Sequence, residues 1–173
     1  MLSAFLALLA ALLIFWLVMG GLSLAPWVPT KRRDIQRVQA LVKLRPGETL
    51  YELGCGDGRV CHALARANPQ AHVVGIELSP LVFCLAWLRN RIAPQANLSL
   101  RRANIFYCDL SDADVIYIFG MPQALEKLQQ YLRRTCTKPV RIVSYSFAPG
   151  DGIKSVRNKL NPQQISLFEY TIS

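Results

Sequence analysis

Charged residues are missing from the beginning of the chain. Residues 1–30 contain no Asp, Glu, Lys, Arg or His, so the whole formal charge of +9 falls on residues 31–173. The apolar run from Leu2 to Ala25 would extend roughly 36 Å as a helix, enough to cross the ~30 Å hydrocarbon core of a bilayer. The missing basic leader argues against a cleaved signal peptide, and the missing polar face argues against an interfacial helix. We therefore expect residues 1–30 to form a transmembrane anchor.

A basic cluster ends the apolar run. Lys31, Arg32 and Arg33 follow it directly, and each would cost about 2.5 to 3.5 kcal/mol at the centre of a bilayer. Basic residues that flank a span stay on the cytoplasmic side. The sequence thus predicts a single-pass membrane protein with the lipid bilayer as a partner and residues 31–173 on the cytoplasmic side.

Patterns typical of metal and nucleic-acid binding are also missing. The five cysteines include no C-x-x-C pair, so we expect reduced, small core residues and no disulfide or zinc site. Asp109, Asp112 and Asp114 precede an apolar run, which favours capping and solvation of a strand start over a metal site. Basic and aromatic residues do not alternate as they do in single-strand binders. Neither a metal nor a nucleic-acid partner is expected.

Residues 31–45 have the pattern of a basic amphipathic helix. The apolar positions on one face are Ile35, Val38, Leu41 and Val42. The basic positions assigned to the other face are Arg32, Arg33, Arg37 and Lys43. Two interpretations stay open: a solvated cationic face, and a contact with anionic lipid headgroups in which each charge adds up to about 1 kcal/mol.

Beyond Pro46-Gly47, short apolar runs alternate with helical patterns. Strands are predicted at 49–53, 72–78, 98–101, 114–120, 141–145 and 165–172, and helices at 59–68, 80–91 and 123–134. Such alternation needs crossover connections and therefore a mainly parallel sheet with helices on both faces. We predict an α/β, doubly wound, Rossmann-like domain over residues 46–173.

Three glycines stand in the turn after the first predicted strand. In YELGCGDGRV these are Gly54, Gly56 and Gly58, at the place where α/β sheets usually contact a ligand. Glycine permits positive φ there and a close approach of the ligand to the main chain. A dinucleotide fingerprint would have its third glycine at position 59, where the sequence has Arg59. This difference argues against NAD.

Polar residues also mark the ends of the first three predicted strands. Glu52 is placed to meet an ammonium group, and Glu77, nineteen residues after Gly58, is placed to accept both hydroxyls of a ribose. Asn104 and Ile105 offer an amide side chain and a backbone N–H to the edge of an adenine. Their occurrence at consecutive strand ends favours one ligand that all three bind.

The motifs ELGCGDG, GIELSP and ANIF resemble the cofactor site of class I S-adenosylmethionine-dependent methyltransferases, across residues 46–145. The resemblance implies a seven-strand fold with S-adenosylmethionine as cofactor. It assigns Glu52 and the backbone of residues 54–58 to the methionine part, Glu77 to the ribose and Asn104 to the adenine. The complete set of cofactor-binding candidates is Glu52, Gly54, Cys55, Gly56, Asp57, Gly58, Glu77, Leu78, Asn104 and Ile105.

A narrower resemblance is to the membrane-anchored lysine methyltransferases of the ATP synthase c subunit and the adenine nucleotide translocase. It is carried by the apolar N-terminal segment, by PWVPT and by NIFYCDLSDADVIYIFGMPQ. It implies lysine N-methylation of a membrane protein. The segment SFAPGDGIKSVRNKLNPQQ does not share this likeness, so two other functions stay open: methylation of a lipid or quinone, and a non-catalytic anchored cofactor-binding module.

A lysine acceptor would need apolar walls. Its amine, with a pKa near 10.4, must lose a proton, and burial against apolar side chains lowers that pKa. The wall candidates follow the fourth and fifth predicted strands and are Phe119, Met121, Pro122, Tyr145 and Phe147. Plain core packing is an equally open interpretation of these residues.

Overall fold

The predicted order of strands and helices is found in the structure. The computed structural model describes residues 6–7, 28–150, 152–159 and 161–173. The elements are, in chain order, α2 (Arg32–Val42), β1 (Thr49–Leu53), α3 (Arg59–Ala67), β2 (His72–Glu77), α4 (Pro80–Ile92), β3 (Leu98–Arg102), the 3-10 helix η1 (Ile105–Tyr107), β4 (Val115–Ile118), α5 (Pro122–Thr135), β5 (Val140–Tyr145), β6 (Val156–Asn158) and β7 (Leu167–Ile172). Each element predicted beyond residue 30 is present, with ends shifted by at most a few residues.

The predicted transmembrane run falls on residues outside the described ranges, apart from residues 6–7. Within those ranges, no helix combines the length and the apolar character that crossing a membrane requires. The anchor therefore stays a prediction.

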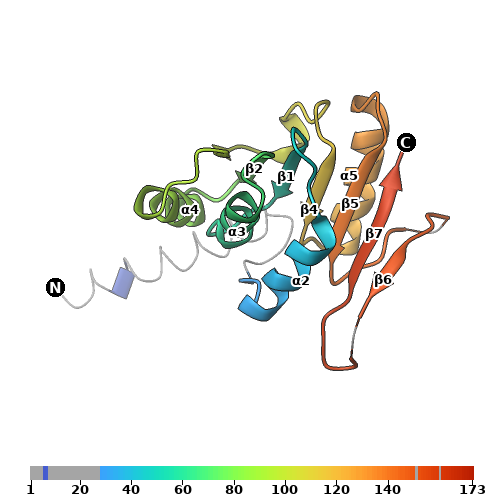
Figure 1. Cartoon of the computed structure of the whole chain (residues 1–173), viewed down its shortest axis with the longest axis horizontal. Helices are drawn as coiled ribbons and strands as arrows, with labels where there is room; N and C mark the ends of the chain where they lie inside the picture. Colours follow the sequence, from blue (N-terminus) through green and yellow to red (C-terminus); the bar gives the residue numbers. More distant parts are fainter. Residues whose placement is uncertain (1–5, 8–27, 151, 160) are drawn as a thin grey trace.

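The strands form one seven-stranded sheet in the order β3-β2-β1-β4-β5-β7-β6 (Figure 1). The pairings among the first five strands are parallel, as crossover helices require. Strand β7 pairs antiparallel with β5, and β6 pairs antiparallel with β7. The result is a mixed, mainly parallel, Rossmann-like sheet.

Helices cover both faces of the sheet. One core cluster joins α5 to the sheet through Leu125, Leu128 and Leu132. The other joins α2 and α3 to the opposite face, with Val38 and Leu64 fully buried. Helix α4 packs beside α3 and against β2 and β3, so it lies at the end of the sheet away from β6 (Figure 1).

Two short elements escaped the sequence-based prediction. Strand β6 has only three residues, all exposed or half-buried, so it carries no apolar alternation that would indicate a strand. It depends on pairing with β7. The 3-10 helix η1 begins after Asn104, whose side-chain oxygen accepts a hydrogen bond from the backbone N–H of Phe106 (3.1 Å).

The prediction for Arg37 was wrong. Instead of joining the cationic face of α2, the guanidinium turns inward and donates to Asp34 (3.0 Å), to the carbonyl of Ile165 (2.9 Å) and to the carbonyl of Asn158 (3.1 Å). Its attraction to the buried Asp34 carboxyl and to these two backbone carbonyls outweighs hydration. Arg32, Arg33 and Lys43 are exposed, so the cationic face is smaller than predicted.

The prediction for the cysteines was also wrong in one place. All five are free thiols, and Cys55 and Cys61 are buried as expected. Cys84, however, is exposed because it lies on the outward side of α4. That helix is apolar on its outward side as well as its inward side, so hydrophobic character did not reveal which side faces the core.

Candidate active site

The three polar strand ends meet at the carboxyl edge of the sheet. Glu77 joins them: its Oε2 accepts from the N–H of Gly56 (2.9 Å) and its Oε1 from the N–H of Ser79 (2.8 Å). Its backbone carbonyl accepts from the N–H of Ala103 (3.1 Å). Since strand order reverses around β1, this edge is where open α/β sheets bind ligands.

The glycine turn has a conformation that favours glycine. Gly54, Gly56 and Gly58 have φ values of 76°, 59° and 71°, all in the left-handed region that costs other residues about 1–2 kcal/mol. The N–H groups of Gly54 and Cys55 both donate to the carbonyl of Ile76 (2.9 Å each). The turn is thereby attached to the end of β2.

Gly58 also meets a steric limit. It is the N-cap of α3, and a Cβ added there would lie 3.0 Å from the Cβ of Ala86 and 3.2 Å from its Cα. Because the second of these atoms belongs to the backbone of α4, it cannot move aside as a flexible side chain could. The contact lets α3 and α4 pack closely behind the turn.

Glu52 holds a buried carboxyl group without a hydrogen-bond partner for one oxygen. The residue is 4% exposed, and among the described residues its Oε2 has no partner. Burial raises the pKa of Glu52 to about 8, and the charges of Asp57 and Glu77 add to this rise. The Tyr117 hydroxyl is likewise buried and unpartnered in the described part of the chain. A buried oxygen without a hydrogen-bond partner lowers the stability of the fold unless a ligand donates a hydrogen bond to it.

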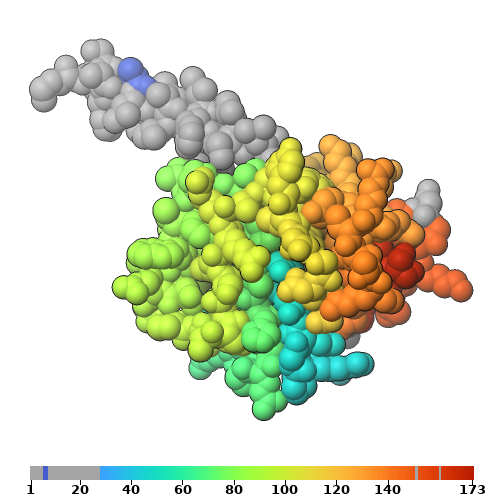
Figure 2. Space-filling view, turned by 90° about the horizontal axis from the view of Figure 1, so that it is seen from above, coloured from blue at the N-terminus to red at the C-terminus, as the bar shows by residue number. Residues whose placement is uncertain are grey.

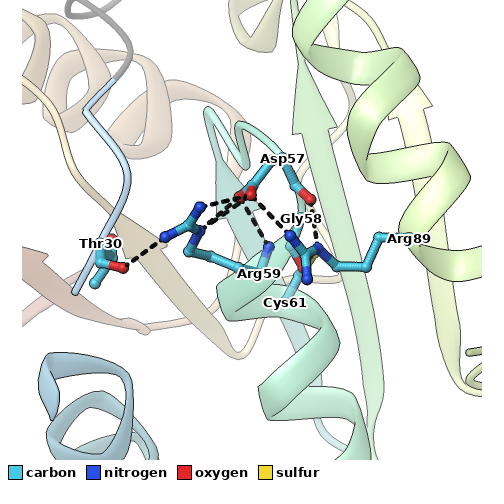
Figure 3. A network of polar contacts seen from close by, with 6 residues as sticks. All are labelled: Thr30, Asp57, Gly58, Arg59, Cys61 and Arg89. Carbon is cyan, nitrogen blue, oxygen red and sulfur yellow. Dashed lines mark hydrogen bonds and ion pairs between the residues drawn. The ribbon is translucent and has the colours of Figure 1, made fainter. Parts of the chain in front are cut away.

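Asp57, within the turn, belongs to an ion-pair network (Figure 3). Its carboxylate accepts from Arg59 (2.8 Å) and from Arg89 of α4 (2.8 Å). Burial opposes ionisation of Asp57, but the hydrogen bonds and charges of the two arginines outweigh it and lower the pKa. Arg59 also donates to the carbonyl of Thr30 (3.2 Å). The network therefore connects the turn, α4 and the chain that enters α2.

The remaining cofactor candidates lie at the ends of β2 and β3. Leu78 is half-buried directly after Glu77. Ile105 is 5% exposed, and the side-chain oxygen of Asn104 is used to cap η1. All ten candidates therefore belong to segments that follow or end β1, β2 and β3.

The five acceptor-wall candidates do not form one cluster. The rings of Phe119 and Tyr145 pack edge to face with centroids 4.7 Å apart. Phe147 packs against the core cluster that contains α5, while Phe119 packs against the other. Met121 and Pro122 are exposed. The structure thus brings together two of the five.

Tyr145 is tied to a residue that sequence reasoning missed. Its hydroxyl donates to the Asp34 carboxylate (3.0 Å), and burial together with this bond raises the pKa of Tyr145. Asp34 is 1% exposed and links α2 to β5. One signal was available: Asp34 is the only acidic residue among the first 47.

The predicted strand-capping acids lie at the other end of the sheet. Asp114 accepts from the N–H of Thr49 (2.8 Å) and pairs with Lys138 (2.6 Å). Asp112 accepts from the hydroxyl of Tyr51 (2.8 Å). The described residues contain no group of three or more His, Cys, Asp or Glu side chains placed to hold a metal.

The site has the features that an adenosyl-sulfonium cofactor with an amino-acid tail would use. The unpartnered Glu52 oxygen is a ready acceptor for an ammonium group, and the turn beside it has a bare, left-handed backbone. The fold and this site define a class I S-adenosylmethionine-dependent methyltransferase.

Comparison with known proteins gives the particular family. Residues 52–155 match the family described as ANTKMT methyltransferase domain, and the chain belongs to that family. It is 30% identical to a protein-lysine N-methyltransferase of Saccharolobus islandicus, across 70% of this chain and 76% of that protein. It is 29% identical to the mouse adenine nucleotide translocase lysine N-methyltransferase, across 70% of this chain but 53% of the relative.

A solved structure agrees with this assignment. An RNA methyltransferase from Salinibacter ruber, in complex with S-adenosyl-L-homocysteine, superposes with a TM-score of 0.74 at 28% identity. The superposition covers 84% of this chain and 94% of the other. The methyltransferase class, the family resemblance and S-adenosylmethionine as cofactor, all predicted from the sequence, are confirmed.

Proposed function

We propose that this methyltransferase is anchored in a membrane and methylates a lysine side chain of a membrane protein. The observation that carries the proposal is the 3.2 Å hydrogen bond from Arg59 to the carbonyl of Thr30. It holds the beginning of the domain against the glycine turn. The predicted span precedes Thr30 in the chain. It would therefore join the domain beside the cofactor site. A lysine near the bilayer surface would lie within reach of that site.

The cofactor-binding roles follow from the free groups at the site. The Glu52 oxygen that lacks a partner would accept from the cofactor's ammonium group. Each Glu77 oxygen already accepts one backbone N–H, and a carboxylate oxygen can accept a second hydrogen bond, so both could also receive ribose hydroxyls. The amide NH₂ of Asn104 would face the adenine, because the side-chain oxygen caps η1.

The proposed acceptor side would be apolar, as methylation of an amine requires. S-adenosylmethionine supplies a methyl group already activated on a sulfonium, so the protein needs no nucleophile of its own. Phe119 and the exposed Met121 follow β4, and Tyr145, which packs against Phe119, is the last residue of β5. Apolar walls at this place would favour the neutral form of a lysine amine and orient it.

The names of the two relatives, both lysine N-methyltransferases, support a lysine side chain as the methyl acceptor. A lipid or quinone acceptor is a second candidate, since the predicted anchor places the site at a bilayer. RNA is a third, because the Salinibacter protein of the same fold is an RNA methyltransferase and the chain carries +9.

The deciding experiment separates these acceptors. The purified full-length chain is incubated with methyl-labelled S-adenosylmethionine and membranes from cells that lack it, and the label is counted in protein, organic-extract and RNA fractions. We expect label in protein and methyl-lysine in its digest. The Glu52→Gln variant, which keeps the shape but cannot ionise, should lose most of this transfer. Label confined to the lipid or RNA fraction would reject the proposal.

A further inference from the structure

Helix α4 exposes an apolar face that the fold leaves uncovered. Of the ten large hydrophobic residues exposed in the described chain, five belong to this one helix. Four of them and Cys84 recur at helical spacing and make one stripe, which we call the α4 stripe: Leu81, Cys84, Leu85, Leu88 and Ile92. Their exposed fractions reach 76% at Ile92. A contiguous face of this kind marks an interaction surface.

The charged residues of the segment that carries the stripe have one sign. Residues 78–108 contain four arginines and no Asp, Glu or Lys. These arginines are Arg89, Arg91, Arg101 and Arg102. Arg89 is bound to Asp57 and Arg101 lies near Tyr51 on the other face of the sheet, so Arg91, over the Trp87 ring, is the basic side chain beside the stripe. The segment forms one flank of the molecule, from light green to yellow-green in Figure 2. An apolar stripe on a segment without acidic residues complements a surface that is apolar inside and anionic outside.

An interfacial anchor accompanies the stripe. Trp87 is 53% exposed beside it, and the Arg91 guanidinium lies over its ring, 5.8 Å from the ring centre. An exposed tryptophan combined with a basic side chain is typical of helices that lie in the headgroup region of a bilayer.

The place of the stripe in the fold also indicates a membrane. Arg89 of α4 and Arg59 bind the same Asp57 carboxylate, and Arg59 in turn holds Thr30. Two ion pairs and one hydrogen bond therefore connect α4 to Thr30, the last of the 30 uncharged residues that begin the chain. If those residues span a bilayer, its surface lies next to this helix.

We propose that the α4 stripe docks onto the surface of an anionic lipid bilayer as a second, peripheral membrane contact of this protein. The inference rests on the proposed membrane location but not on the identity of the methyl acceptor. The apolar side chains would enter the headgroup boundary while the Arg91 guanidinium beside Trp87 remains among the phosphates. Together with the anchor, this contact would fix how the domain lies on the membrane.

Cys84 provides a natural reporter on the stripe. In the full-length chain, Cys108 and Cys136 are replaced by alanine, and the buried Cys55 and Cys61 are kept, so that Cys84 reacts with a water-soluble maleimide. The labelling rate is compared in vesicles of phosphatidylcholine alone and of phosphatidylcholine with phosphatidylglycerol, and also in detergent without phospholipid. We expect about tenfold slower labelling in the anionic vesicles, which corresponds to about 1.4 kcal/mol of protection.

Matched variants test whether the stripe itself carries this protection. Leu88→Glu should remove the difference between the two kinds of vesicle. Val156→Glu should keep it, because Val156 is 68% exposed on β6 at the other end of the sheet. Urea unfolding checks that both variants fold.

Two results would overturn the proposal. Equal labelling rates in both kinds of vesicle would exclude an anionic bilayer as the partner. Slow labelling in detergent would show that another part of the chain, or a second copy, covers the stripe. The assay contains no cofactor or acceptor, so failure of lysine methylation leaves it unaffected, and failure of Cys84 protection leaves the methyl-transfer result unaffected.

Discussion

At the scale of single residues, Glu52 is the clearest compromise between stability and function. A carboxyl group with one unpartnered, buried oxygen lowers the stability of the empty protein. The same oxygen is what an ammonium-bearing cofactor needs. The cost to the empty fold and the affinity for the cofactor therefore have one origin, and both depend on whether Glu52 is ionised.

The raised pKa of Glu52 predicts how stability varies with pH. The pKa changes from its ordinary value of 4.5 to about 8 in the folded chain. Between these values the unfolded chain releases the proton while the folded chain keeps it, so stability from this group falls as pH rises, at about 1.4 kcal/mol per unit. Glu52→Gln removes this slope. In urea unfolding at pH 5, 6.5 and 8, the unfolding free energy of the variant should increase relative to that of the natural protein as pH rises.

Exposed Glu126 offers the control for this experiment. Glu126→Gln makes the same Glu-to-Gln change at an exposed position, and it should not reproduce the gain expected for Glu52→Gln. A constant difference between Glu52→Gln and the natural protein over this range would contradict the assigned ionisation.

At the scale of elements, the cofactor turn depends on how closely α3 and α4 approach each other. Gly58 combines a positive φ with the contact to Ala86, so it satisfies a backbone requirement and a packing requirement at once. Asp57 next to it is held by one arginine from each helix. The turn is therefore shaped by the helix pair behind it as well as by its own glycines.

Two glycine variants separate these requirements. Gly47→Ala tests the backbone requirement alone, because Gly47 has φ +81° and nothing lies within 4 Å of the added Cβ. We expect this variant to lose about 1–2 kcal/mol of unfolding free energy. Gly58→Ala carries that cost and the overpacking against Ala86, about 1–3 kcal/mol more. Urea unfolding measures the difference, and calorimetry should show weaker S-adenosylmethionine binding for Gly58→Ala alone. Equal losses of stability would mean that α4 moves aside freely.

At the scale of the whole molecule, apolar and charged residues are distributed unevenly. The first 30 residues hold no charge, while residues 31–173 hold all 20 basic and 11 acidic residues. Basic side chains directly after an uncharged run predict the orientation of the chain in a membrane.

This orientation is tested with the full-length chain in the membrane of a bacterial host. Alkaline carbonate should leave the chain in the membrane pellet, and detergent should release it. A protease added outside intact spheroplasts should spare residues 31–173, and the same protease should degrade them after permeabilisation. Release by carbonate would reject the anchor, and digestion in intact spheroplasts would reverse the orientation.

The order of strands and helices, the glycine turn and the acidic strand ends could all be predicted from local patterns. Apolar periodicity distinguishes strands from helices, and a turn that needs positive φ selects glycine, so these features depend on residues close together in the chain. The convergence of Glu52, Glu77 and Asn104 at one edge followed as well, because parallel strands place their carboxyl ends together.

Tertiary contacts decided the rest. Asp34 and Tyr145 are 111 positions apart, and no local pattern pairs them or turns Arg37 inward. Strand β6 is defined by its partner β7. Which side of α4 faces outward is determined by the packing of its other side against the domain. Whether a polar or apolar side chain ends up buried, paired or exposed depends on which distant segment reaches it, and that information exists only in the folded chain.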